Sequence, residues 1–472
     1  MRYSVIYCVS IMLLKLDILF HNYYFIIPTD VVIMHSRYDI YRIYISILKC
    51  GSMAFNACSL CKGRKLLCGK SKCPILEKIR VFEDIKNKFY KKLNKNEIFG
   101  ASPPSIFVGE YNYPNVRIAP LVPPIEGDTS FMGSPLNWEN KSIKAIIKYR
   151  SMLVMGETKY ININIQKGKT YKTTKDTKNT KILESIQELA MAIKPVDSEI
   201  VLKRKPSFDI VSNGFAPPIS PKGDLLKFNI TENPKIPLKS EYVVNDELKA
   251  SDSIILLYNY GYDEYYIVKL LSAGLLGMQK KLVPTRWSIT GVQDIIGRHL
   301  TRNIINYPLI NDYEVYYGEF LGNRYAVLII PDYYAYELME VWERESLFGG
   351  NSNSPLVLGD YEDLKIKGYA KETTGAFYAS RLSVLEYLNK RKRQGKIIVF
   401  REITPDYYAP VGVWQIRTGV KKSFNNYVYK FNTLQDALNK IDELLGVPIE
   451  LYRLKSKIIS KSRQMRIDEY YF

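Results

Sequence analysis

Four cysteines lie within sixteen residues of the chain and could together bind a metal ion. They are Cys58, Cys61, Cys68 and Cys73, in the spacing C-x2-C-x6-C-x4-C. Four thiolates close a tetrahedral Zn(II) shell without a water position, so the pattern predicts a structural zinc knuckle and not a catalytic metal. An iron–sulfur cluster uses the same four ligands, and local disulfides or free thiols are the third interpretation.

The distribution of cysteines also indicates the compartment. No cysteine follows Cys73, whereas a secreted disulfide scaffold would spread its cysteines over the chain, so the pattern predicts an intracellular protein. Basic residues inside the knuckle balance the charge of the thiolates. Three of them are candidate nucleic-acid contacts, although the spacing leaves open whether the knuckle touches DNA or only holds the next helix: Lys62, Arg64 and Lys65.

The C-terminal end contains a second motif, Q-x2-I-x2-Y-Y. Its residues are Gln464, Ile467, Tyr470 and Tyr471, and six Lys or Arg with no acid lie between Leu451 and Ile467. One helical turn would place the isoleucine and the two rings together as a hydrophobic plug, while the Gln amide docks separately. This fits the peptide pattern that binds a sliding clamp; a frayed or core-docking tail is the alternative.

Arg286 and Trp287 are adjacent candidates for nucleic-acid binding. The guanidinium could contact a phosphate and the indole could stack on a base. The alternative is a buried structural Trp beside a salt-bridged Arg. Other polar candidates in the distinctive segments are Arg117, Ser288, Asp294, Arg381 and Arg401, and His299 is expected to pack within a helix.

Several carboxylates could serve a metal-dependent nuclease. Such an enzyme needs carboxylates that converge on two Mg(II) or Mn(II) ions, and the candidates are Glu126, Asp128, Glu337, Glu340 and Glu402. Arg286 is a further catalytic candidate. The carboxylates are far apart in the sequence, so their convergence is a hypothesis. The alternative is that they form turns and ordinary ion pairs, which leaves the catalytic residues unknown.

The charge composition of the chain indicates which class of binding partner to expect. The 472 residues include 67 Lys and Arg against 48 Asp and Glu, a net charge of +19, with 46% hydrophobic residues. Such a chain can bury a core and favours a polyanionic partner, with nucleic acid first and an anionic membrane second. A bias toward solubility or a lysine-rich genome is the alternative.

Residues 1–52 differ in residue composition from the rest of the chain. Their apolar run at residues 3–14 is too short to span a bilayer, which takes about 20 residues, and no cleavage site follows it. We expect an over-extended start or an appendage, with the working protein beginning near Met53. A membrane-associating N-terminus is the alternative.

The remaining chain predicts an α+β body of two lobes. The expected parts are residues 53–98 (knuckle and basic helix), 99–240 (first lobe with Pro/Gly-rich loops and linker), 241–450 (second α+β lobe) and 451–472 (basic leash and clamp peptide). The lobe boundary is expected within the Pro-rich residues 204–240. Apolar periodicity predicts helices at residues 79–95, 288–305 and 375–394, and strands at 313–320, 324–331, 333–342 and 396–403.

Several long segments resemble the archaeal Nre family. They are FGASPPSIFVGEYNYPNVRIAPLVPP with GDTS after it, LVPTRWSIT, GAFYASRLSVLEYLNKRKRQ, REI and PVGVWQIR. The resemblance covers nearly all of residues 53–472 and implies a DNA repair factor. It also implies the zinc role for the four cysteines and binding of the sliding clamp PCNA by the C-terminal peptide; nothing in the family pattern accounts for residues 1–52.

Two functions are therefore expected. The first is a DNA repair adaptor that binds DNA and is recruited through PCNA; the second is a DNA repair nuclease with the same tether. An RNA-binding translation factor is disfavoured by the tail. We expect a cytoplasmic, nucleoid-associated protein with no membrane partner.

Overall fold

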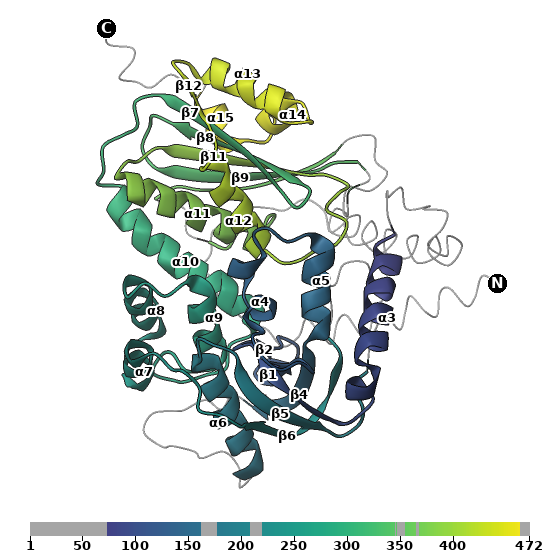
Figure 1. Ribbon diagram of the computed structural model, residues 1–472. Coiled ribbons are helices and arrows are strands. Elements are labelled where there is room, and N and C mark those ends of the chain that lie inside the picture. The colour runs from purple at the N-terminus through teal and green to yellow at the C-terminus, as the bar shows by residue number, and fades with distance from the viewer. Residues whose placement is uncertain are drawn as a thin grey trace, which may run out of the picture. The chain divides into compact units, whose positions relative to one another are not determined.

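The computed structural model describes residues 73–161, 177–207, 220–344, 346, 355–364 and 368–462. All of the described residues, which are coloured in Figure 1, belong to one compact unit that spans Cys61–Phe472. The predictions for residues 1–52, for the first three knuckle cysteines and for the clamp peptide lie outside the described residues.

The first lobe is built on a mixed six-stranded sheet of order β1-β5-β6-β4-β3-β2, in which only β4 and β6 pair in parallel. Its elements are α3 (Pro74–Leu93), β1 (Glu97–Ser102), β2 (Ile106–Val108), β3 (Asn115–Val122), α4 (Ser130–Gly133), the short 3-10 helix η1 (Pro135–Trp138), α5 (Ile143–Met152), β4 (Val154–Ile161), α6 (Thr177–Met191), β5 (Val196–Leu202) and β6 (Lys222–Ile230).

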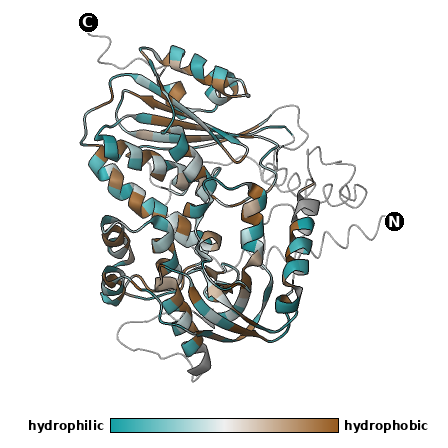
Figure 2. Ribbon diagram, in the orientation of Figure 1, coloured by the Kyte–Doolittle hydropathy of each residue, from teal (hydrophilic) through white to brown (hydrophobic). Residues whose placement is uncertain are grey.

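Helix α3 confirms the predicted basic helix but begins five residues earlier. Pro74 is its first residue, a position where the missing N–H has no helical partner to lose. The helix buries Val81, Ile85 and Leu93, and hydrophilic residues colour much of its visible side (Figure 2). Its buried apolar residues therefore join the core, while Arg80, Lys88, Lys91 and Lys92 are exposed.

Strand β6 corrects the expectation for the Pro-rich segment. Residues 204–240 were expected to cross between lobes, yet residues 222–230 form a strand between β5 and β4 within the first sheet. The prolines flank this strand and do not interrupt it: Pro221 precedes it and Pro234 follows it. A strand needs its N–H groups only between its ends, so flanking prolines are compatible with pairing on both sides.

The second lobe contains another mixed six-stranded sheet, of order β10-β9-β11-β8-β7-β12. Four helices lie between the two sheets in sequence: α7 (Leu238–Asn245), α8 (Ala250–Asn259), α9 (Glu264–Ser272) and α10 (Thr285–Ile304). The lobe continues with β7 (Tyr313–Phe320), β8 (Asn323–Ile330), β9 (Ala335–Trp342), β10 (Leu356–Glu362), α11 (Gly375–Arg391), β11 (Lys396–Ile403), α12 (Trp414–Ser423), β12 (Val428–Phe431), α13 (Leu434–Leu444), α14 (Ile449–Arg453) and α15 (Lys457–Ser462).

The predicted strands and helices of this lobe are confirmed. The second sheet is covered on both faces, by α11 and α12 on one side and by α13 to α15 on the other (Figure 1). Strands buried on both faces are largely apolar, which explains the run IIVF in β11; the buried Arg401 and Glu402 that follow it have ionic partners. Leu321 and Gly322 both have positive φ and join β7 to β8 as a two-residue hairpin.

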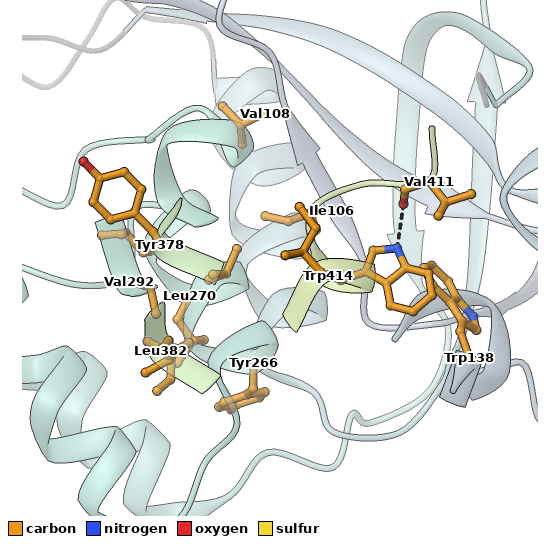
Figure 3. Close-up of a cluster of buried hydrophobic side chains, with 14 of the residues drawn as sticks. Ile106, Val108, Trp138, Tyr266, Leu270, Val292, Tyr378, Leu382, Val411 and Trp414 are labelled. Carbon is orange, nitrogen blue, oxygen red and sulfur yellow. Dashed lines mark hydrogen bonds between the residues drawn. The ribbon is translucent and has the colours of Figure 1, made fainter. Parts of the chain in front are cut away.

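One hydrophobic core runs through both lobes. Ile106 and Val108 of β2 belong to the same buried cluster as Val292 of α10 and Leu382 of α11 (Figure 3). The rings of Trp138 and Trp414 meet edge to face at 5.2 Å. The short strand β2 is therefore held against the helices of the second lobe.

Candidate nucleic-acid interface

Arg286 and Trp287 lie in the first turn of α10, which begins at Thr285 directly after Pro284. The loop between β2 and β3 reaches them from the first lobe, because the backbone N–H of Val108 donates to Thr285 Oγ1 at 2.9 Å. This hydrogen bond, together with the apolar packing of β2, places residues 109–114 beside the start of α10.

Glu110 of that loop contacts both candidate residues. Its Oε1 lies 3.1 Å from an Arg286 Nη atom, and its Oε2 accepts a hydrogen bond of 3.2 Å from Trp287 Nε1. The indole is 46% exposed and the Arg286 side chain 74% exposed. Arg286 is thus salt-bridged, as the alternative interpretation held, but the burial of Trp287 in that interpretation is wrong.

Two tyrosines extend the aromatic surface around Trp287. The ring of Tyr113 lies 5.0 Å from the indole, tilted by 50°, and Tyr111 is largely exposed in the same loop. Exposed aromatic rings beside an arginine are the features that single-stranded nucleic acid uses for stacking and phosphate contact.

A surface cavity of about 530 Å³, the Trp287 cavity, opens beside these residues. Its lining comes from the β2–β3 loop, α10, the loop before α11 and the start of α11: Glu110, Arg286, Trp287, Thr290, Gly291, Asp294, Tyr369 and Tyr378. In Figure 3 the Tyr378 ring points away from Val292 and Leu382. Its hydroxyl accepts a hydrogen bond from Ala370 N at 3.1 Å, and burial raises the pKa of this phenol.

Asp294 lines the cavity and is held by two arginines. Arg381 lies 2.6 Å from one carboxylate oxygen and Arg298 lies 2.7 Å from the other. Arg381 is buried and also contacts Glu362 at 2.5 Å. Burial alone would lower the pKa of Arg381, but Glu362, Tyr334 and Asp294 outweigh it and raise the pKa, so the guanidinium stays charged.

Asp360 organises the loop that carries Tyr369 toward α11. Its carboxylate accepts hydrogen bonds from the backbone N–H groups of Lys371, Glu372 and Thr373 at 3.0, 3.0 and 2.6 Å. Three such bonds fix the backbone of this turn. The loop that contributes Tyr369 to the cavity lining is therefore held by its own polar contacts.

The nuclease candidates do not gather in one place. Glu126 is exposed and lies 4.0 Å from Lys92, and Asp128 accepts from the backbone N–H of Ser130 at 2.9 Å. Hydrogen bonds from Ser130 lower the pKa of Asp128. Asp128 therefore acts within the turn before α4, whereas Glu126 lies near a lysine of α3.

The three glutamates of the second sheet have separate structural partners. Glu337 accepts from Ser456 Oγ and from the N–H groups of Lys457 and Ile458, at the start of α15. Glu402 pairs with Arg324 at 2.8 Å. The partner of Glu340 is Arg401. In the described part of the chain no three Cys, His, Asp or Glu are arranged to hold a metal ion, so these carboxylates lend no support to a two-metal nuclease.

The remaining candidates lie elsewhere. Arg117 pairs with Glu157 at 2.5 Å on the first sheet, Ser288 Oγ donates to the Val283 carbonyl at 3.4 Å, and His299 is half-buried on α10. Cys73 directly precedes α3; the other knuckle cysteines lie outside the described ranges, as do Lys62, Arg64 and Lys65.

Sequence reasoning missed Glu110, Tyr113, Tyr369 and Tyr378. The only local signal was the aromatic, Pro-containing run EYNYP between two short strands. With 38 tyrosines in the chain, such a run does not single out a site.

Within the described ranges, no helix is both long enough and apolar enough to cross a bilayer.

Comparison with known proteins places the chain in a family. Residues 67–349 match the model "Archaeal Nre, N-terminal" and residues 362–470 match "Archaeal Nre, C-terminal". The boundary between these models lies nearer the C-terminus than residues 204–240. No solved structure is similar at a significant level.

Curated relatives agree with the family models. DNA repair protein NreA of Archaeoglobus fulgidus is 39% identical over 386 residues, which cover 81% of this chain and 92% of that protein. DNA repair protein NreB of the same organism is 31% identical, covering 88% and 99%. NreA of Haloferax volcanii is 34% identical, covering 83% and 93%. The chain therefore belongs to the archaeal Nre family.

Proposed function

We propose that this protein is a DNA repair protein of the DNA damage response that binds DNA at the surface formed by Arg286, Trp287 and Tyr113. The observation that carries the proposal is the exposure of Arg286 and Trp287 side by side at a cavity. The names of the relatives and the net charge of +19 support the same partner. Such a protein would work at the chromosome, in the cytoplasm.

Binding of labelled DNA tests this surface. Arg286→Ala removes one phosphate contact, so the affinity should fall and the slope of log affinity against log salt should decrease by about 1. The matched control is Arg117→Ala, which removes another exposed, singly paired arginine from the first sheet. Equal affinities of Arg286→Ala and the unchanged protein would refute the assignment.

We further propose that Gln464, Ile467, Tyr470 and Tyr471 bind PCNA. Helix α15 ends at Ser462, two residues before the motif begins, and the buried Glu337 accepts hydrogen bonds at its first turn. Because α15 is held to the second sheet, the peptide that follows it would extend from a fixed point on the protein. This supports its role as a tether to PCNA.

Truncation after Ser462 tests the tether. Calorimetric titration with PCNA should show binding to the full chain and none to the truncated chain, while the unfolding midpoint stays unchanged. Tyr470→Ala with Tyr471→Ala should reproduce the loss. Clamp binding by the truncated protein would contradict the proposal.

Finally, we propose that Cys58, Cys61, Cys68 and Cys73 hold a structural Zn(II). Four thiols are the donor set of closed zinc sites, and the position of Cys73 directly before α3 would tie the metal to a helix whose apolar stripe joins the core. Elemental analysis should find one zinc ion per chain, and the purified protein should be colourless. Visible absorption with bound iron would identify an iron–sulfur cluster instead.

A further inference from the structure

We propose that the Trp287 cavity binds one unstacked base of single-stranded DNA. This inference rests on the proposed DNA-binding function and specifies its ligand. The cavity lies at the surface, has a volume of about 530 Å³, and combines aromatic walls with polar groups. Pockets that receive a base taken out of its stack have this combination of ring faces and hydrogen-bonding groups.

The aromatic walls come from separate elements. Trp287 projects from the first turn of α10, and Tyr369, which is also exposed, comes from the loop before α11. Tyr113 lies against the indole at 5.0 Å and supports it. Gly291, four residues after Trp287, also lines the cavity and contributes no side chain, and no heavy atom lies within 4 Å of the place where a Cβ would be. A planar ring can therefore enter beside Trp287.

The polar groups of the cavity suit the edge of a base. Asp294 is fixed by Arg298 and Arg381, and an ionised carboxylate has about four lone-pair sites, so it can accept further hydrogen bonds. Thr290 adds a hydroxyl to the lining. Amino and imino groups of a base would find acceptors here, whereas a phosphate would be repelled by Asp294.

Arg286 stands at the mouth of the cavity, where the backbone of the strand would pass. Its guanidinium now pairs with Glu110, and the same carboxylate accepts from Trp287 Nε1. A DNA phosphate that approaches Arg286 would take the place of the Glu110 carboxylate as the partner of the guanidinium. Glu110→Gln should therefore tighten DNA binding several-fold, because the competing charge is removed while the shape of the side chain is kept.

The cavity also selects the form of the DNA. Bases of an intact duplex are stacked and paired, so entry would require unpairing, which costs a few kcal/mol per base. A single strand can turn a base outward at much lower cost. The cavity therefore favours single-stranded segments over intact duplex.

Tryptophan fluorescence of the full chain provides a direct test, because a base that stacks on an exposed indole quenches its emission. The chain has four tryptophans, and Trp138, Trp342 and Trp414 are buried. Titration with oligothymidylate should quench the emission of Trp287. The quenching should vanish in Trp287→Phe and persist in Trp342→Phe, the matched control.

Affinity measurements complete the test. Trp287→Ala should weaken binding of the oligothymidylate by roughly tenfold, and Gly291→Leu, which narrows the cavity beside Trp287, should also weaken it without exchanging an aromatic residue. A strand of the same length that carries only abasic sites should bind without quenching. Equal affinity for matched duplex and single strand, or an affinity for the single strand that Gly291→Leu leaves unchanged, would overturn the inference.

The two proposals can fail separately. If the protein binds single-stranded DNA with unchanged Trp287 emission, the base site is wrong and the DNA-binding function stands. If the protein binds neither single-stranded nor duplex DNA, the proposed function itself is wrong.

Discussion

The arginines singled out by the sequence have different roles once their surroundings are known. Arg286 is exposed at the proposed interface, whereas Arg401 is buried with Glu340 and donates two hydrogen bonds to Asn323 Oδ1 at 3.0 and 2.8 Å. Both residues lie in segments that resemble the family. Burial alone separates a residue that can reach DNA from one that cannot.

Arg401→Met should destabilise the fold by about 3–5 kcal/mol, because it leaves the buried carboxylate of Glu340 without its partner. Arg286→Ala should change the free energy of unfolding by no more than about 0.5 kcal/mol, as is usual for exposed positions. Urea unfolding of the two variants measures both values. Similar losses in both would show that the two ion pairs are energetically alike.

Lys269 of α9 connects stability to pH. Its Nζ donates to the Ala192 carbonyl at 3.3 Å and lies 4.8 Å from the centre of the Tyr266 ring. Burial lowers the pKa of Lys269 to about 7, while Asp263 opposes this shift. The unfolded chain holds this proton up to a pKa of about 10.4. Between these two values the unfolded state binds more protons, so the free energy of unfolding should rise with pH.

Lys269→Met should therefore flatten the rise in stability between pH 7 and pH 9, and it should stabilise the protein most at pH 7. Urea unfolding of both proteins at several pH values gives the difference between them, which isolates Lys269 from other titrating groups. A pH slope that is unchanged by the substitution would mean that this ammonium is charged in the folded protein.

At the scale of elements, Gly291 of α10 and Gly419 of α12 differ in how closely their neighbours approach. A Cβ added at Gly419 of α12 would overlap the ring of Tyr325, a buried residue of β8, whereas a Cβ added at Gly291 of α10 would meet nothing. Glycine in α12 allows close packing of the helix on the second sheet. Glycine in α10 leaves space beside Trp287.

Gly419→Ala should lower the free energy of unfolding by about 1–3 kcal/mol through overpacking. Gly291→Ala should raise it by up to about 1 kcal/mol, because alanine has the higher helix propensity and meets no obstacle. Thermal unfolding of both variants compares the same substitution in two helix interiors. The close-packing argument fails if the two changes have the same sign.

At the scale of the whole unit, the lobes share one core and should unfold together. Trp138 of the first lobe packs on Trp414 of α12, and the cluster around them includes residues of both sheets. Separation of the lobes would expose apolar residues of both lobes to solvent. Helices α9 and α10 therefore join the lobes and do not act as a flexible hinge.

Trp138→Ala should cost about 3–5 kcal/mol and should lower hydrogen-exchange protection in β8 and β11 as much as in β3. The unfolding curve should keep a single transition. Loss of protection confined to the first sheet would show that the lobes are separate cooperative units.

Local patterns were sufficient for much of the fold. The helices α3 and α11 and the strands β7, β8, β9 and β11 follow from apolar periodicity, because that periodicity records which face each element buries. The strand β6 was missed, since flanking prolines hid it. The family resemblance also came from contiguous residues, and the comparisons confirm it.

The sequence by itself established the family resemblance, and it provided a polyanionic partner, the two terminal motifs and the Arg286–Trp287 pair as hypotheses. Only the tertiary structure decided which polar residues meet. Glu110 and Arg286 lie 176 positions apart and form an ion pair, whereas the carboxylates proposed for a nuclease are held at separate places. The reason is physical: periodicity encodes the burial of each element, but contacts between distant residues depend on how the elements pack into one core.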